Sequence, residues 1–251
     1  MSEPVTAAKC GALLDALRVK KPLVHFITNY VTVNDCANIT LAVGGAPVMS
    51  DQPDDAAEIC RLASALVFNI GTPGDRTLEA MLRAGKAANE AGIPVVLDPV
   101  GAGASSFRNR LLEKLLEEVK FAAVKGNISE IRFLASGTGK SMGVDASKDD
   151  IALGSDSSAV ARLAAGLSRG IGAVVIVSGR IDVAADGERA YGISNGDAMM
   201  GRLTGTGCMG SGVVASFLGA APGEPLASSI AGMCVMGLAG ELARKKLAPS
   251  S

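Results

Sequence analysis

Short apolar runs alternate with longer Ala- and Leu-rich segments along most of the chain. The short runs are rich in β-branched residues and are apolar on both faces, which is typical of strands in a parallel sheet covered on both sides. Six such strands are predicted, at residues 23–28, 46–50, 65–70, 94–97, 121–124 and 173–178. Between them, apolar residues at three- and four-residue spacing predict helices at residues 32–44, 55–64, 75–91, 107–118 and 157–168.

The repeated strand, helix, strand order predicts an α/β fold with right-handed crossovers and helices on both faces of the sheet. The pattern changes after residue 178. Residues 180–185 and 188–193 flank the turn dipeptide Asp186-Gly187 and predict an antiparallel hairpin, so the sheet should be mixed at one edge. Further helices are predicted at residues 208–218 and 226–246, separated by a turn at residues 220–223.

The composition favours one compact domain over residues 1–251. The chain has 31 Gly, 48% hydrophobic and 20% charged residues and a formal net charge of -1, a profile that excludes disordered and collagen-like proteins. It has 24 Lys and Arg against 25 Asp and Glu, only 3% aromatic residues and no Trp. Because nucleic-acid binding relies on a concentrated positive field and on stacking side chains, we expect no nucleic-acid partner.

The cysteines indicate reduced thiols. There are five, an odd number, and no two lie closer than 24 residues, so neither a CxxC metal pair nor a disulfide framework can be drawn. The first residues lack a basic segment followed by an apolar one, and no apolar run reaches 18 residues. We expect a cytoplasmic protein with no membrane partner.

Candidate chemistry gathers after the predicted strands, where ligands bind in open α/β sheets. Polar and glycine-rich segments follow the strands at residues 28–31, 49–51, 69–72, 98–103, 125–127 and 178–179. Residues 204–208 read Thr-Gly-Thr-Gly-Cys and open directly into a helix, which predicts an anion pocket of backbone N–H groups. Asp98 and Glu130 supply hard oxygen ligands that suit Mg2+. The composite predicts phosphoryl transfer, although each glycine or Asp alone also fits a simple turn.

Two nucleotide motifs are only partly matched. Residues 137–141 resemble the end of a P-loop, but the required first glycine falls on Leu134 and the preceding residues look helical. Residues 205–210 fit GxGxxG, yet no strand, acidic residue and second βαβ unit follow at the right distance. Both a Walker A site and a dinucleotide fold are therefore rejected.

Several strings together resemble the hydroxyethylthiazole kinase family. They read PLVHFITNYV at residues 22–31, NDCAN at 34–38, GAPVM at 45–49, LDPVGAG at 97–103, KGNISEI at 125–131 and TGTGC at 204–208, so the resemblance spans almost the whole chain. It implies a ribokinase-like three-layer α/β/α sandwich, and ATP- and Mg2+-dependent phosphorylation of the hydroxyl of 4-methyl-5-(2-hydroxyethyl)thiazole in thiamine biosynthesis or salvage. It also implies a homotrimer with active sites between subunits.

The resemblance implies a role for each matched residue. The thiazole would contact Asn29, Val31, Met49 and Gly205; the metal would be held by Asp98 and Glu130; and ATP and its phosphates would contact Lys125, Ser178, Thr206 and Gly207. Cys208 stands where related sugar kinases have an aspartate base. Two positions depart from the family pattern, because Lys125 and Ser178 stand where Arg and Thr are common, and Lys cannot make the bidentate contact of Arg.

Several alternatives remain at this point. Cys208 at a helix start has a lowered pKa or is a small buried apolar residue. His25, the only histidine, lies within an apolar strand and is interpreted as structural. If the sites lie between subunits, residues 29–49 should face the 205–208 turn of a neighbour, and the helix at 226–246 is either core or subunit contact. The alternative functions are another ribokinase-like vitamin kinase, for pyridoxal or hydroxymethylpyrimidine, and a non-catalytic nucleotide- or thiazole-binding regulator.

Overall fold

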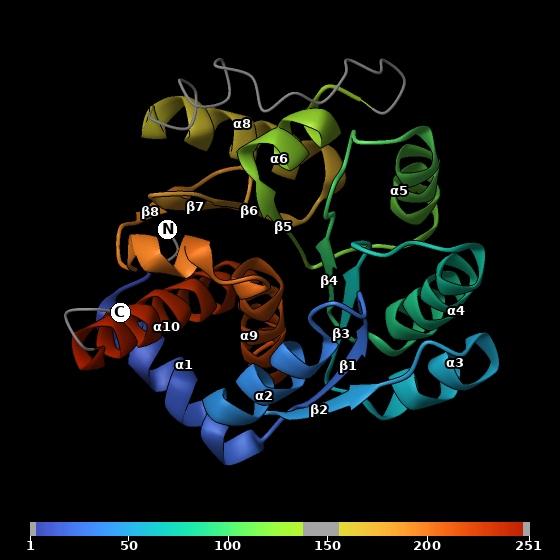
Figure 1. Cartoon of the computed structure of the whole chain (residues 1–251), viewed down its shortest axis with the longest axis horizontal. Helices are drawn as coiled ribbons and strands as arrows, with labels where there is room; N and C mark the ends of the chain where they lie inside the picture. Colours follow the sequence, from blue (N-terminus) through green and yellow to red (C-terminus); the bar gives the residue numbers. More distant parts are fainter. Residues whose placement is uncertain (1–3, 138–155, 248–251) are drawn as a thin grey trace.

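The central element of the computed structural model is an eight-stranded sheet with the order β2-β1-β3-β4-β5-β6-β7-β8 (Figure 1). The structure describes residues 4–137 and 156–247. Strands β1 to β6 are parallel, and β7 and β8 are antiparallel at one edge. The strands are β1 (Leu23–Ile27), β2 (Ala46–Met49), β3 (Ala65–Asn69), β4 (Val95–Asp98), β5 (Ala123–Asn127), β6 (Val174–Ser178), β7 (Asp182–Ala185) and β8 (Ala190–Ile193).

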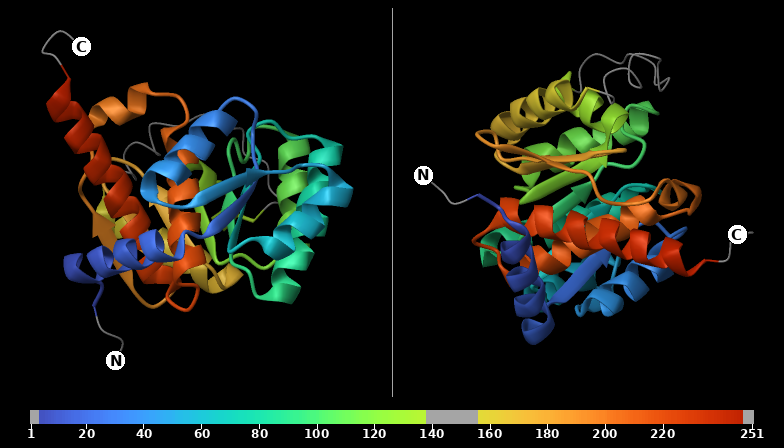
Figure 2. Two further views of the ribbon diagram at one scale, coloured as in Figure 1. Left: turned by 90° about the horizontal axis from the view of Figure 1, so that it is seen from below. Right: turned by 90° about the vertical axis from the view of Figure 1, so that its left-hand side faces the viewer.

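Helices cover both faces of this sheet and make three layers (Figures 1 and 2). One face packs against α3 (Pro53–Leu62), α4 (Asp75–Ala91), α5 (Ser106–Glu118), α6 (Ile128–Ala135) and α8 (Ser157–Ile171). The other packs against α1 (Ala7–Lys20), α2 (Val33–Val43), α9 (Thr206–Ala220) and α10 (Pro225–Lys246), and a 3-10 helix, η1 (Ala198–Arg202), precedes α9. The predicted α/β sandwich with an antiparallel edge is confirmed.

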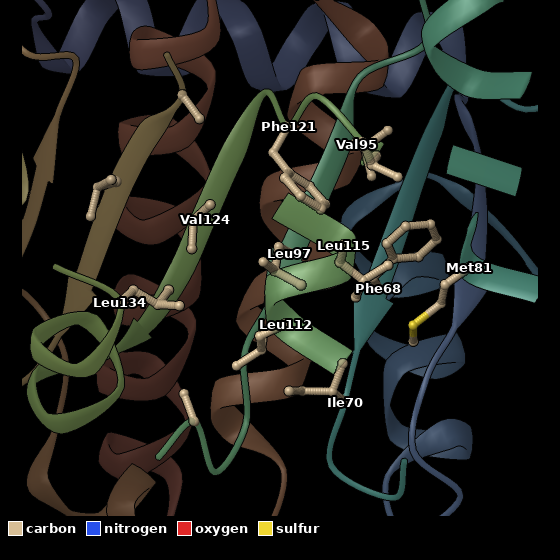
Figure 3. Close-up of a cluster of buried hydrophobic side chains, with 14 of the residues drawn as sticks. Phe68, Ile70, Met81, Val95, Leu97, Leu112, Leu115, Phe121, Val124 and Leu134 are labelled. Atoms are coloured by element: carbon tan, nitrogen blue, oxygen red, sulfur yellow. The ribbon is translucent and has the colours of Figure 1, made fainter. Parts of the chain in front are cut away.

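The larger core lies between the sheet and the α3, α4, α5, α6 and α8 layer (Figure 3). Phe68 on β3 and Phe121 before β5 meet edge to face, with ring centroids 6.3 Å apart. Leu97, Leu112 and Leu115 are fully buried around them. Burying each such side chain contributes about 1.5–3 kcal/mol, so this cluster fixes the strand positions that carry the site.

The strand predictions hold in number and order, with one shift that matters for function. Strand β5 was expected at residues 121–124 but runs over Ala123–Asn127, because it pairs with β6 along its whole length, including Lys125 with Ile176 and Asn127 with Ser178. Lys125 is therefore a buried strand residue, 3% exposed, and does not lie in a loop after the strand.

Two of the described α-helices were not predicted, and neither was the 3-10 helix η1. Helix α1 begins at the N-cap Thr6 and buries only Leu13 and Leu17, so its sequence carries little apolar periodicity. Helix α6 has eight residues and follows β5 without a loop; a capping box starts it, since Asn127 accepts a hydrogen bond from the Glu130 N–H and Glu130 accepts one from the Asn127 N–H. Residues 138–141 of the P-loop-like string lie outside the described residues.

Helix α10, for which the sequence allows either a core position or a subunit contact, is in part a core helix. Its first half is buried against α9 and the sheet, whereas Leu238 and Leu242 near its end are each 49% exposed. It is also the one described helix with the length and apolar content to span a membrane, and 56% of its apolar window is buried inside the fold, as in a core helix. The structural interpretation of His25 is supported, since its buried ring is hydrogen-bonded through Nε2 to the Ser50 carbonyl, 2.8 Å away.

Candidate active site

The candidate site lies where β3 and β4 end beside the first turns of α9. Asn69 and Asp98 are paired as the last residues of these neighbouring parallel strands. Cys208 and Ser211 reach them from α9, which packs on β3 and β4. The strands and the helix come from distant parts of the chain, so the sheet order and the packing of α9 on β3 and β4 together bring these four side chains into one place.

Asp98 is the buried acid of this cluster, at 4% exposure. Its Oδ2 accepts hydrogen bonds from Asn69 Nδ2 at 2.8 Å and from Ser211 Oγ at 2.9 Å. Burial raises the pKa of Asp98, against the opposing effects of the Lys125 charge and of the side-chain interactions with Ser211, Asn69 and Cys208. Ionising this carboxylate therefore carries an electrostatic cost, which a further cation would offset.

This burial gives a prediction on stability. A raised folded-state pKa means that Asp98 contributes most to stability at low pH and loses that contribution as pH rises through its folded pKa. Asp98→Asn has no such titration. We expect the melting temperature of the variant, relative to the wild type, to increase as the pH is raised from about 4, near the ordinary pKa of an aspartate, to 8 in thermal scans. A constant difference across this range would contradict the raised pKa.

Cys208 is held as a neutral thiol. Its Sγ receives hydrogen bonds from Asn69 Nδ2 at 3.1 Å and from Asn29 Nδ2 at 3.5 Å. Burial, and then the negative charge of Asp98, raise the pKa of Cys208, although its hydrogen bonds to Thr32, Asn69 and Asn29 act in the opposite direction. The lowered pKa considered from its position at a helix start is therefore wrong, because desolvation and the charge of Asp98 raise it.

The glycine turn before Cys208 requires glycine at residue 205. Gly205 is the N-cap of α9 with φ 88°, and a Cβ there would lie 2.6 Å from Thr32 Cγ2. The first turn of α9 is held to the sheet, since Lys125 Nζ on β5 donates to the Gly207 carbonyl at 2.9 Å. Thr206 is tied back toward η1 through Oγ1 to the Met200 carbonyl at 3.1 Å. The first N–H groups of α9 are thus presented at the site in a fixed direction.

Gly205→Ala therefore combines two penalties, and Gly172→Ala provides a matched control. Gly172 also has a positive φ, 67°, but nothing lies within 4 Å of a Cβ built there. We expect Gly172→Ala to cost about 1–2 kcal/mol in stability with unchanged turnover. Gly205→Ala should cost more and should also lower turnover, because Thr32 and the helix start must move apart. Equal melting temperatures and unchanged activity in the two variants would contradict this.

Glu130 also lies at the carboxyl ends of the strands, in the first turn of α6 directly after β5. Its Oε1 accepts from the Gly101 N–H at 3.0 Å and its Oε2 from the Asn127 N–H at 2.8 Å. Burial raises the pKa of Glu130, opposed first by these two hydrogen bonds, and the Asp98 charge raises it further. Glu130 thus connects the loop after β4 to the end of β5. It has a structural capping function whether or not it also contacts a metal.

The donor set suits Mg2+ better than a transition metal. No group of three or more His, Cys, Asp and Glu side chains that could hold a metal occurs within residues 4–137 and 156–247. Asp98 and Glu130 provide one buried and one half-buried carboxylate, near enough for the charge of Asp98 to affect Glu130. Mg2+ usually takes one or two carboxylates and completes its shell with water and phosphate oxygens. The residues present fit such an ion, which Asp98 would hold directly and Glu130 through water.

Of the remaining predicted residues, Asn29 joins the cluster through Nδ2, which donates to Asn69 Oδ1 and Cys208 Sγ, and the others are less tightly joined. Asn29 is 4% exposed, and its Oδ1 accepts from the Thr32 N–H, which closes the turn between β1 and α2. Val31 is 60% exposed, and Met49 ends β2, half-buried. Ser178 ends β6 and donates to the Gly126 carbonyl at 3.3 Å. No hydrogen bond joins Val31, Met49 or Ser178 to Asp98 or Cys208 in the described chain.

Asn29 contacts Cys208 of its own chain, so the expectation that Asn29 faces the glycine turn of a neighbouring subunit is wrong. The turn after β1 folds directly onto α9, with Thr32 packed against Gly205. Complementation between an Asn29 variant and a Cys208 variant in mixed oligomers is therefore not expected.

Sequence reasoning gave no role to Asn69, Ser211, Thr32 or Arg108. Arg108 on α5 donates to the carbonyls of Val100 and Gly71, each at 2.9 Å, and also to that of Ile70, and so joins the loops after β3 and β4. The polar residue at the end of a buried strand was a usable signal for Asn69. The other residues act through contacts between distant segments, which sequence spacing does not show.

An open cavity lies elsewhere. It has a volume of about 680 Å³ and is lined by the starts of α1 and α10 and by the β7–β8 turn, with Lys9, Glu224, Asp186 and Arg189 among its residues. The cavity lies at the amino-terminal ends of the parallel strands, because Ala185 before the β7–β8 turn pairs with Val175 near the start of β6. Asp98 lies at the opposite ends of these strands, as the last residue of β4. The candidate site is defined by its hydrogen-bonded cluster and not by this cavity.

Comparison with known proteins decides the family. The model of the hydroxyethylthiazole kinase family matches residues 14–251. The chain belongs to the hydroxyethylthiazole kinase family. Among its relatives, the hydroxyethylthiazole kinase of Clostridium beijerinckii is 48% identical over 238 residues, covering 95% of this chain and 85% of that protein. The one from Ruminiclostridium cellulolyticum is 49% identical over 231 residues, covering 92% and 83%.

Solved structures agree with the family and with the fold. The hydroxyethylthiazole kinase of Pyrococcus horikoshii superposes with a TM-score of 0.84 at 35% identity, over 94% of this chain and 86% of that one. Bacillus subtilis pyridoxal kinase, at 15% identity and a TM-score of 0.57 over 83% and 88%, shares the fold alone. The family resemblance and the ribokinase-like fold predicted from sequence are both confirmed.

Proposed function

We propose that this hydroxyethylthiazole kinase family member transfers a phosphoryl group from ATP to the hydroxyl of 4-methyl-5-(2-hydroxyethyl)thiazole, in thiamine biosynthesis or salvage. One observation carries the proposal. The amide nitrogen of Asn69 donates to both Asp98 and Cys208, beside the start of α9. A carboxylate suited to Mg2+ and a residue that can contact the substrate alcohol therefore lie side by side at a helix start that favours anions.

The phosphates of ATP are assigned to the start of α9. Its orphan N–H groups and helix dipole favour anions, and Lys125 adds a buried positive charge within hydrogen-bond reach of Gly207. Thr206, Gly207 and Ser178 supply further polar contacts along this edge. Asp98 and, through water, Glu130 hold Mg2+, which when bound neutralises charge on the transferred phosphoryl group. Lys125 acts as a point charge, without the bidentate geometry of an arginine.

The thiazole is assigned to the side of Asn29, Val31, Met49 and Gly205. Val31 and Met49 offer apolar surface near the ends of β1 and β2, and Asn29 adds an amide beside the Cys208 sulfur. This places the substrate hydroxyl toward Cys208. Because Cys208 is a neutral thiol, it orients the alcohol by hydrogen bonding, and positioning with charge stabilisation carries most of the rate.

A substrate panel tests the assignment. The wild-type protein is offered the thiazole alcohol, pyridoxal and hydroxymethylpyrimidine with ATP and Mg2+, and ADP release is followed in a coupled assay. We expect the highest kcat/KM for the thiazole alcohol. Equal or greater kcat/KM for either other alcohol would overturn the substrate assignment. Thiazole binding without any ADP release would instead favour the non-catalytic regulator.

Oligomerisation and location complete the proposal. Tyr30 and Val31 are 78% and 60% exposed, and Leu203 is 61% exposed close to the start of α9. These exposed side chains beside the site support a subunit contact there, and we propose a homotrimer whose neighbouring subunit covers the Val31 side, while Asn29 and Cys208 act within one chain. Light scattering that reports a monomer would contradict the trimer. A single domain over residues 1–251, a cytoplasmic location, and the lack of nucleic-acid or membrane partners stay predictions.

A further inference from the structure

The carboxylate of Asp98 is held through one oxygen by two neutral donors. Asn69 Nδ2 and Ser211 Oγ lie 2.8 and 2.9 Å from the same atom, Oδ2. Asn69 comes from the end of β3 and Ser211 from α9, and the two residues are 2% and 0% exposed. Two buried donors from different elements on one oxygen restrict rotation of the carboxylate, since turning it would leave a donor unpaired at a cost of about 1–3 kcal/mol.

The Asn69 amide is itself fixed by four contacts. Its Nδ2 donates to Asp98 Oδ2 and to Cys208 Sγ at 3.1 Å. Its Oδ1 accepts from Asn29 Nδ2 and from the Gly71 N–H, each at 2.9 Å. The two acceptor contacts determine which end of the amide faces Asp98 and Cys208. Asn69 therefore sets the relative position of the carboxylate and the sulfur.

We infer that Asn69 and Ser211 are positioning residues, which hold Asp98 by Oδ2 so that Oδ1 is offered to the divalent cation. Asn69 in addition holds the Cys208 sulfur at a fixed distance from this carboxylate. The inference rests on the proposed function, because it concerns the same site. It assigns to neither residue a contact with substrate, and both act through Asp98 or Cys208.

A simpler interpretation gives both residues local structural roles. Asn69 would only close the turn after β3 through Gly71, and Ser211 would only donate to the Gly207 carbonyl, 3.4 Å away, as serines in helices commonly do. The chain supplies a matched control for Ser211. Ser216, also fully buried on α9, donates to the Gly212 carbonyl at 2.9 Å. It lies outside the cluster around Asp98.

The experiment compares Ser211→Ala with Ser216→Ala in the full chain. Three quantities are measured: kcat and KM for the thiazole alcohol, the melting temperature, and Mn2+ binding in the presence of ADP, from the loss of the free Mn2+ electron paramagnetic resonance signal. We expect Ser211→Ala to weaken Mn2+ binding and lower kcat by about tenfold, as for loss of one hydrogen bond to a charged group. KM should change less than twofold. Ser216→Ala should leave kcat and Mn2+ binding unchanged.

Asn69 variants extend the test. Asn69→Asp keeps the shape and the acceptor for Gly71 but puts a second carboxylate oxygen where the shared donor was. We expect kcat to fall by at least as much as in Ser211→Ala, because contacts to both Asp98 and Cys208 are lost. If Asn69→Asp fails to fold, the Ser211 and Ser216 pair decides alone.

The outcomes separate this inference from the proposed function. Equal kcat and equal Mn2+ binding in Ser211→Ala and Ser216→Ala, with an active wild type, would overturn the positioning role and leave the kinase assignment standing. A wild-type protein that phosphorylates none of the offered alcohols would overturn the proposed function itself.

Discussion

Replacing Asp98 with asparagine should lower kcat by about 10²–10³-fold, the effect of removing one preorganised charge-stabilising group from an active site. Asn keeps the size of the side chain and can still accept hydrogen bonds from Asn69 and Ser211, so the cluster should stay folded. KM for the thiazole alcohol should change only a few-fold, because the thiazole is assigned to the Asn29 side. Steady-state kinetics at saturating ATP and Mg2+ measure both quantities.

Glu130→Gln changes the second carboxylate, and its kcat should fall less than that of Asp98→Asn. Both Glu130 oxygens already accept backbone N–H groups, from Gly101 and Asn127, so its effect on a metal passes through water. Gln retains one acceptor oxygen, and its amide NH2 faces the other N–H. Wild-type turnover in both Asp98→Asn and Glu130→Gln would mean that the two carboxylates only cap turns.

Cys208→Ala should lower kcat by about 10²-fold, the loss that misplacing a reacting group typically brings. The variant removes the sulfur that contacts Asn29 and Asn69 but keeps the backbone N–H groups of the α9 start, so measurable activity should remain. Cys208→Asp should match or exceed the wild type if this residue accepts the hydroxyl proton, because a carboxylate is the stronger base.

Cys60→Ala is the matched control for this series. Cys60 is a fully buried thiol on α3, and burial raises its pKa to about 11. Its replacement should lower the melting temperature without changing kcat. Unchanged kinetics in both Cys208 variants would mean that the Cys208 side chain contributes only to packing. A Cys208→Asp variant less active than Cys208→Ala would exclude a proton-accepting role.

The sequence predicted the fold well because its signals are local. Both-face apolar runs, helical periodicity and the Asp186-Gly187 turn each depend on neighbouring residues, and the structure confirms the strands, their mixed edge and most helices. The errors arose where tertiary pairing replaced local pattern. Strand β5 extends past its apolar run because β6 pairs with it, and Lys125 is buried as a result.

The site was predicted only in part. Asp98, Glu130, Cys208 and Gly205 could be singled out because strand ends and glycine turns are visible in the chain, and their functional roles stay predictions. Ser211 was not, since nothing in its helical segment shows that α9 lies against β4. The raised pKa of Cys208 could not be predicted from the sequence either, because the Asp98 charge that contributes to it lies 110 positions earlier in the chain. Direction and burial of a side chain follow from packing, which motifs do not encode.

The most direct test of the central claim is a phosphorus NMR measurement of the reaction mixture with ATP, Mg2+ and the thiazole alcohol, for the wild type and for Asp98→Asn. The account predicts a phosphomonoester resonance that grows in step with ADP for the wild type and is nearly absent for the variant. Phosphomonoester formation by Asp98→Asn at the wild-type rate, or ADP without phosphomonoester in the wild type, would contradict a phosphoryl-transfer site at Asp98 and the start of α9.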